Sequence, residues 1–197
     1  MANANVARGL IPVRHMSGAP YNGAGNVYYV PSTDGTALFI GDPVKLVTDD
    51  SDANGIPTVT RAAAGDSLQG VVVGVLSHGD PAVPVLQSDP VYRAADTERY
   101  VLVADDPDLL FEAQEDGVGG AMDAGAGGRN VEFIVAAGDT NTGYSGVELD
   151  SNTLATTNTL SLRVHRPAER ADNDATLTNA KWLVSINLHR LRSTTGV

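Results

Sequence analysis

The residues best suited to chemistry in this sequence are aspartates gathered in two short stretches. The first stretch, DSDANG at 50–55, matches the start of a calcium-binding EF-hand loop, where alternating oxygens surround the ion and glycine makes the turn. The last position of such a loop should be a bidentate glutamate, but here it is Arg61, and Pro57 interrupts the expected continuation. The pattern therefore favours an aspartate-rich turn between two strands over a cation site at Asp50, Asp52 and Asn54, and we predict no metal.

The second stretch places Asp105, Asp106 and Asp108 around a proline, with Glu112 soon after them. Neighbouring carboxylates can share a proton or hold a cation, as paired acids do in glycoside hydrolysis. Aspartate beside proline is also ordinary turn chemistry at the end of a strand, and we favour this interpretation. The four carboxylates nevertheless support an alternative function, that of a carbohydrate-binding or hydrolytic β domain.

Other chemical centres are missing or weakly indicated. The sequence has no cysteine, which excludes disulfides and thiolate metal sites, and it has no Gly-x-Ser-x-Gly nucleophile motif. The glycine-rich stretch at 117–128 lacks the lysine and hydroxyl residue of a phosphate-binding loop. The histidines are not spaced as zinc ligands are; they are His15, His78, His165 and His189. We therefore predict a protein that is not an enzyme, with no catalytic residue and no cofactor.

The charge distribution disfavours nucleic acid as the main partner. The chain has 24 acidic residues and 13 basic ones, a formal net charge of −11, whereas phosphate binding needs a clustered basic surface. Residues 1–33 contain Arg8 and Arg14 but no acidic residue. No run approaches the roughly 20 apolar residues that span a bilayer, and the first residues do not resemble a signal peptide. We expect a soluble chain made in the cytoplasm, without a nucleic-acid or membrane partner.

Short strands joined by tight turns account for most of the chain. Residues 181–189, beginning with Lys181 and Trp182, alternate apolar and mostly polar side chains, the pattern of a half-buried strand. In the apolar run at 70–76, Gly74 suggests a bulge or a close approach of another segment. The expected strands lie at 26–30, 36–40, 44–48, 58–60, 70–76, 99–104, 109–114, 131–136, 160–165 and 181–189. They predict an all-β fold with little helix, either a β-barrel or a jelly-roll-like β-sandwich.

Residues 1–25 depart from this pattern. They contain glycines and prolines without a sustained period, so we predict an extended N-terminal arm that buries little against its own domain. Residues 26–197 then form the β body, and the loop at 77–98 can divide that body into two β subdomains. The arm also supplies the candidate residues for contact with a neighbouring subunit, which are Arg8, Leu10, Ile11, Val13, Arg14 and Tyr21.

Eight stretches spread along the chain carry a family resemblance. They are PYNG at 20–23, YVP at 29–31, ALFIGDPV at 37–44, GIPTV at 55–59, YVLVADDP at 100–107, FEAQED at 111–116, SGVELD at 145–150 and NAKWLV at 179–184. In number and order they resemble the capsid cement (decoration) and head structural proteins of tailed bacteriophages. The likeness covers nearly the whole chain.

This resemblance implies a β-barrel-type virion protein on the outer surface of the phage head. Such a protein would bridge neighbouring major capsid protein subunits after the shell expands, as a homo-oligomer, with a trimer slightly ahead of a dimer. Arg8 and Arg14 would face carboxylates of the capsid or of a sister subunit, with the arm as a strap, while the acidic body faces solvent. The alternatives are the carbohydrate-binding or hydrolytic domain of a tail or surface structure, and a head–tail joining subunit.

Overall fold

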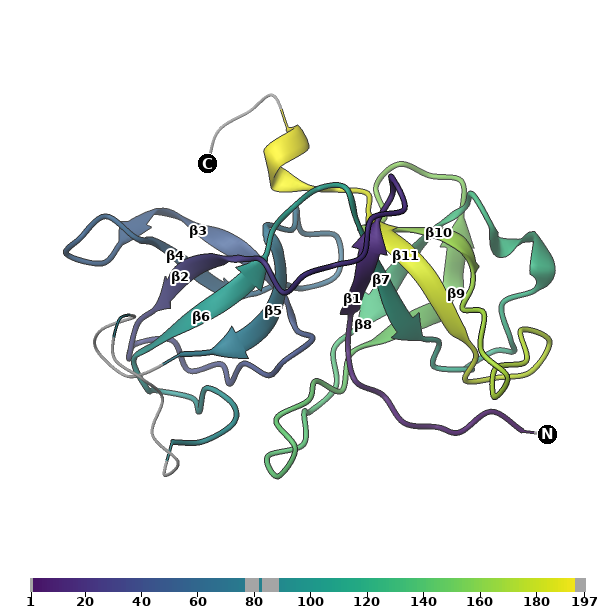
Figure 1. Cartoon of the computed structure of the whole chain (residues 1–197), viewed down its shortest axis with the longest axis horizontal. Helices are drawn as coiled ribbons and strands as arrows, with labels where there is room; N and C mark the ends of the chain where they lie inside the picture. Colours follow the sequence, from purple (N-terminus) through teal and green to yellow (C-terminus); the bar gives the residue numbers. More distant parts are fainter. Residues whose placement is uncertain (1, 77–81, 83–88, 194–197) are drawn as a thin grey trace.

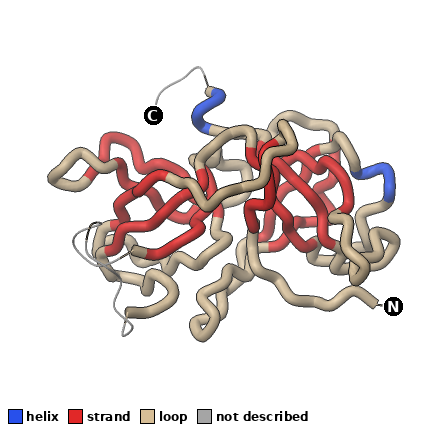
Figure 2. Tube along the Cα trace, viewed as in Figure 1, coloured by secondary structure: helices blue, strands red, loops and turns tan. Residues whose placement is uncertain are grey.

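The computed structural model describes residues 2–76, 82 and 89–193, and they form two β-sheets with very little helix (Figure 2). Strands β2–β6 close into a barrel, and the remaining strands form a six-stranded sheet beside it (Figure 1). Two short 3₁₀ helices, η1 (Ala124–Ala126) and η2 (Arg190–Arg192), lie outside the sheets. The predicted all-β fold with a barrel and little helix is confirmed.

The barrel has the strand order β2-β4-β3-β5-β6. Its strands are β2 (Asn26–Val30), β3 (Pro43–Ser51), β4 (Pro57–Arg61), β5 (Gly70–Val75) and β6 (Arg99–Ala104). β2 and β4 pair in parallel, whereas the other neighbours are antiparallel, and closure gives each strand a partner on both sides. A register shift in β5 between Val72 and Gly74 marks the expected bulge. Valines such as Val59 and Val101 fill the interior.

The second sheet has the order β1-β7-β11-β10-β8-β9, and its neighbouring strands are antiparallel. Its strands are β1 (Ile11–His15), β7 (Leu109–Gln114), β8 (Asn130–Ile134), β9 (Glu148–Ala155), β10 (Leu162–Pro167) and β11 (Lys181–Ile186). An isolated parallel bridge joins Glu115, just after β7, to Leu149 in β9. The sheet therefore curls until β9 approaches the end of β7.

One hydrophobic core runs from the curled sheet to the barrel. Trp182, Phe111 and Phe133 are its largest apolar side chains, and all three are buried inside the curled sheet. Leu68 and Val71, from the barrel side, belong to the same cluster. Because apolar packing crosses the boundary, the two sheets are packed as one body.

Buried polar contacts reinforce this boundary. The Asp42 carboxylate, at the start of β3, accepts hydrogen bonds from the Ser145 hydroxyl at 2.5 Å and from the Phe39 amide at 2.9 Å. Burial raises the pKa of Asp42, although these hydrogen bonds oppose the shift. On the sheet side, the Glu132 carboxylate accepts a bond from the Gly65 amide at 3.0 Å, in the loop between β4 and β5.

The first residues do not form the separate arm that we predicted. β1 pairs with β7, and Leu10 is fully buried in the core. The Asn3 side-chain amide donates to three backbone carbonyls of the loop before β11, those of Asp174, Leu177 and Thr178. The expectation is wrong for residues 3–15 because β7 offers them a strand edge and the core has room for the Leu10 side chain.

The chain crosses from the barrel to the second sheet at residues 105–108, between β6 and β7. The loop at 77–98, where we expected a division, instead joins β5 to β6 within the barrel; its residues 77–81 and 83–88 lie outside the described residues. The strand expected at 36–40 is also not formed. Leu38 and Ile40 make single bridges to two different segments, so no continuous ladder develops.

Candidate interaction surface

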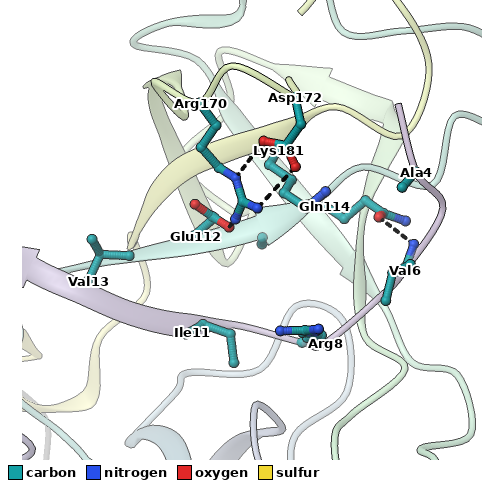
Figure 3. Close-up of a pocket in the computed structure, with 12 residues that line it drawn as sticks. Ala4, Val6, Arg8, Ile11, Val13, Glu112, Gln114, Arg170, Asp172 and Lys181 are labelled. Atoms are coloured by element: carbon teal, nitrogen blue, oxygen red, sulfur yellow. Dashed lines mark hydrogen bonds and ion pairs between the residues drawn. The ribbon is translucent and has the colours of Figure 1, made fainter. Parts of the chain in front are cut away.

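A groove of about 400 Å³ lies on the outer face of β1, β7 and β11 (Figure 3). The N-terminal segment, which we define as residues 4–9, borders one side of the groove. Arg170, Asp172 and Lys181 lie on the opposite side (Figure 3). Strand register explains why residues so far apart in the sequence meet here, since Ile11 pairs with Glu112 and Gln114 pairs with Lys181. Paired positions on neighbouring strands share one face of a sheet.

Apolar side chains form the N-terminal side of the groove. Val6 is 50% exposed and Val13 is 41% exposed, while Ile11 between them is partly buried. Single exposed apolar residues are common on protein surfaces, but these three line one concavity. Contact with another chain would remove this apolar area from water.

A charged network forms the opposite side. The Arg170 guanidinium donates to Glu112 at 2.8 Å and to both carboxylate oxygens of Asp172, at 3.0 and 3.1 Å. These partners raise the pKa of Arg170, and the hydrogen bonds from Arg170 lower the pKa of Asp172. Both carboxylates therefore already have a cationic partner in the same chain, and the three groups together keep a formal charge of −1.

Gln114 holds the N-terminal segment in place at the end of β7. Its side-chain oxygen accepts a hydrogen bond from the Val6 amide at 2.9 Å, and its side-chain nitrogen donates to Asn5 at 2.8 Å. The same nitrogen donates to Glu148 of β9 at 2.6 Å. Burial raises the pKa of Glu148. Gln114 thus connects the edge of the groove to the far strand of the curled sheet.

Arg8 and Lys181 are the other two cations of the groove, and Lys181 is close enough to Asp172 to help lower the pKa of that carboxyl group. Among the residues that the structure describes, neither forms an ion pair. The Arg8 guanidinium lies 5.4 Å from the centre of the Tyr144 ring, a weak cation–π contact that leaves its hydrogen-bond donors available. The groove is therefore lined by three cations and two carboxylates, a formal net charge of +1, beside its apolar side chains.

Three of the six predicted contact residues line this groove, namely Arg8, Ile11 and Val13. Leu10 is not available to a neighbour in this conformation because the chain's own core covers it completely. Arg14 and Tyr21 lie outside the groove. The Tyr21 hydroxyl donates to a nearby backbone carbonyl at 2.8 Å, and the ring lines a smaller pocket of about 170 Å³.

The four carboxylates of the hydrolytic alternative are not gathered in one pocket. Asp105 is buried, and it accepts hydrogen bonds from the Asn26 amide at 3.0 and 2.9 Å and from the Tyr28 hydroxyl at 2.7 Å. The Asp106 carboxylate lies 3.2 Å from the His15 Nδ1, and the other two are in ion pairs, Asp108 with Arg192 and Glu112 with Arg170. Asp105 and Asp106 line the smaller pocket and Glu112 lines the groove.

The aspartate-rich turn is held by its own hydrogen bonds. The Asp52 carboxylate accepts from the amides of Asn54 and Ile56, at 2.9 and 2.7 Å, and from the Tyr100 hydroxyl at 2.7 Å. These bonds lower the pKa of Asp52, that from Tyr100 most. The arrangement is a turn closed by an aspartate side chain, as the sequence indicated.

Two of the histidines are structural, and His78 lies outside the described residues. His189 is buried, and its Nδ1 accepts the Leu191 amide at 3.1 Å, which caps η2. Burial lowers the pKa of His189 to about 4. Burial also lowers the pKa of His165, whose Nε2 lies 2.9 Å from the Ser185 hydroxyl.

Sequence reasoning missed the residues on the far side of the groove, which are Gln114, Arg170, Asp172 and Lys181. Lys181 belongs to the polar face of the strand expected at 181–189, and this placement on an exposed face is the one sequence feature that could have pointed to it. No sequence signal joins the other three to residues 4–13, since their proximity depends on β1 pairing with β7.

Within the described ranges, no cluster of three or more potential metal ligands occurs. The same ranges contain no helix of the length and apolarity needed to cross a membrane. Comparison of the chain with protein-family models, with curated proteins and with solved structures finds no match.

Proposed function

We propose that this chain is a non-enzymatic virion structural protein that binds the outer surface of a tailed-phage head and clamps neighbouring major capsid protein subunits. The observation that carries this proposal is the groove on β1, β7 and β11. Exposed apolar side chains beside cations, at the outer strand of a sheet, make a surface suited to contact with another chain. The resemblance of eight sequence stretches to capsid cement proteins supports the same role.

The mode of attachment differs from the free strap that the sequence suggested. Residues 11–15 of the expected arm form strand β1 of the folded sheet and Leu10 is in the core, so binding would use a preformed face. A preformed face needs less ordering on contact than a loose segment does. Removing residues 2–25 would also remove β1 and the core side chain of Leu10, and we expect that variant to be poorly folded.

The hydrolytic alternative has weaker support from the geometry. Its four candidate carboxylates already have partners within the chain; Asp105 and Asp106 line one pocket, Glu112 lines another, and Asp108 lines neither of the two. A retaining or inverting hydrolase needs a facing pair of carboxyl groups about 5 to 10 Å apart with room for a sugar between them. A clamp requires no such pair.

Sedimentation with purified phage heads tests the proposal. We expect the chain to co-sediment with expanded heads and not with unexpanded ones, and to form a homo-oligomer in solution, with a trimer ahead of a dimer by mass measurement. A variant lacking residues 2–8 keeps Leu10 and β1 but loses one side of the groove, and it should bind heads more weakly. Failure to bind any head, together with binding to a bacterial surface glycan, would contradict the proposal and support the alternative.

A further inference from the structure

The backbone of the N-terminal segment is not part of a sheet, although the Arg8 carbonyl packs closely against Gly41. Among the described residues, residues 4–8 make no backbone–backbone hydrogen bond, and the Val6 amide is held instead by the Gln114 side chain. Segments with free backbone groups are templates on which another extended chain can pair. The segment is nevertheless fixed at both ends, by Asn3 and by the buried Leu10.

The charges around the groove favour an anionic occupant. Three cations line it, Arg8, Arg170 and Lys181, against the carboxylates of Glu112 and Asp172. The groove therefore has a formal net charge of +1, and Arg170 pairs with both carboxylates, which weakens the repulsion that they would exert on an incoming acid. Arg8 and Lys181 therefore remain to pair with a carboxylate of the occupant, although the chain as a whole carries a net charge of −11.

We propose that this groove binds an extended peptide segment of another protein, in which apolar side chains accompany carboxylates. The apolar side chains would cover Val6, Ile11 and Val13, and the carboxylates would meet Arg8 and Lys181. The backbone of the segment would pair with residues 4–8. The proposal deepens the proposed function, since it names the kind of segment that a capsid subunit would present.

A synthetic peptide tests this inference without any phage component. The probe is a short peptide with blocked ends in which valine alternates with glutamate, and its control replaces every glutamate with lysine. The ¹⁵N-labelled full chain is titrated with each peptide, and amide chemical shifts are followed by NMR. We expect the glutamate peptide to shift the amides of residues 4–13 and 170–181, with binding that weakens as salt is added.

Charge reversal supplies the matched variants. Arg8→Glu with Lys181→Glu should weaken binding of the glutamate peptide by roughly tenfold or more, and binding of the lysine peptide should strengthen. Arg14→Glu with Arg190→Glu makes the same change in net charge outside the groove, and it should leave affinity within about twofold. Arg8→Gln with Lys181→Gln is a milder pair that tests the same contacts if the reversed variant does not fold.

Several results would overturn the inference. They are equal binding of the two peptides by the wild-type chain, equal weakening by the two pairs of reversals, or shifts confined to another surface. Protection of the groove by a second copy of the chain, seen as concentration-dependent shifts without peptide, would also overturn it. If the peptide binds as expected but heads do not, the proposed function fails alone; if heads bind the groove-reversed variant normally, the inference fails alone.

Discussion

The barrel and the six-stranded sheet differ in whether their strands are paired on both edges. In the barrel each strand has two neighbours, and the interior is filled mainly by small β-branched side chains. The sheet keeps β1 and β9 as outer strands and buries the large aromatic side chains, including Trp182. The groove lies beside β1. The comparison teaches that closure pairs both edges of every barrel strand, whereas the outer edge of β1 is covered only in part, by residues 19–21, and its exposed side chains border the groove.

The largest expected effect comes from the core of the sheet. Trp182→Ala should lower the free energy of unfolding by about 3–5 kcal/mol, because it empties the space of the largest buried side chain. Leu38→Ala in the barrel should cost about 2–5 kcal/mol. Urea denaturation followed by circular dichroism measures both. Because the core is continuous, each variant should show one transition; separate transitions for the two regions would break the picture of one packed body.

A buried arginine gives the next effect. Arg93 is fully buried, and its guanidinium donates to the carbonyls of Thr97, Thr36 and Pro31, each at 2.6 Å. Arg93→Met should cost about 3 kcal/mol in unfolding free energy because three buried carbonyls lose their donor. The matched variant is Arg170→Met on the sheet surface, where exposure limits the loss to under about 1 kcal/mol. Equal losses of unfolding free energy in the two variants would show that Arg93 stabilises the fold no more than a surface arginine does.

His189 lies at the boundary between the two regions, where it forms a bridge with Leu68, and this boundary should be sensitive to acid. The folded-state pKa of His189 is about 4, below its ordinary value of 6.5, so the unfolded chain binds the proton first as pH falls. The stabilising effect of the neutral histidine is complete above pH 6.5 and is lost towards pH 4, a change of about 3 kcal/mol.

His189→Asn tests this linkage. Asparagine can still accept the Leu191 amide at the start of η2, but it does not titrate. Unfolding free energies measured across this pH range should therefore be flatter for the variant than for the wild type. If the variant and the wild type lost stability equally as pH falls, His189 would not be the source of the acid sensitivity.

The smallest effect concerns one buried hydroxyl at the same boundary. Ser145→Ala removes the hydroxyl that donates to Asp42 and accepts from the Val147 amide, and it should cost about 1–2 kcal/mol, seen as a modest fall in the midpoint of thermal unfolding. The Asp42→Asn variant tests how the ionisation of Asp42 contributes to the pH dependence of stability. Because burial raises the pKa of Asp42 above 3.8, its ionisation lowers stability as pH rises through that region, and asparagine should flatten this slope.

Most strands could be predicted because period-two alternation and turn residues are local signals. The segments at 26–30, 99–104 and 109–114 are strands with those same bounds. β1 and β9 could not be predicted in this way, because β1 contains a proline and an exposed valine and β9 is largely polar. Both are outer strands, where one side of the ladder and much of one face meet solvent, so their sequences carry a weaker hydrophobic pattern.

Only one side of the candidate surface could be predicted from the sequence. The acid-free start of the chain drew attention to Arg8, Ile11 and Val13, all of which line the groove. Its opposite side depends on the pairing of β1 with β7 and of β7 with β11, contacts between segments far apart in the chain. Local patterns do not encode such pairings, and the same limit explains why residues 1–25 suggested a free arm.

The most direct test of the central claim is cryo-electron microscopy of phage particles that carry this chain. We predict density for the two β regions on the outside of the expanded head, spanning more than one capsid subunit, with the face formed by β1, β7 and β11 against the shell. Particles without the chain should lack that density. Density on the tail alone, or a bound chain whose groove faces solvent, would contradict the claim.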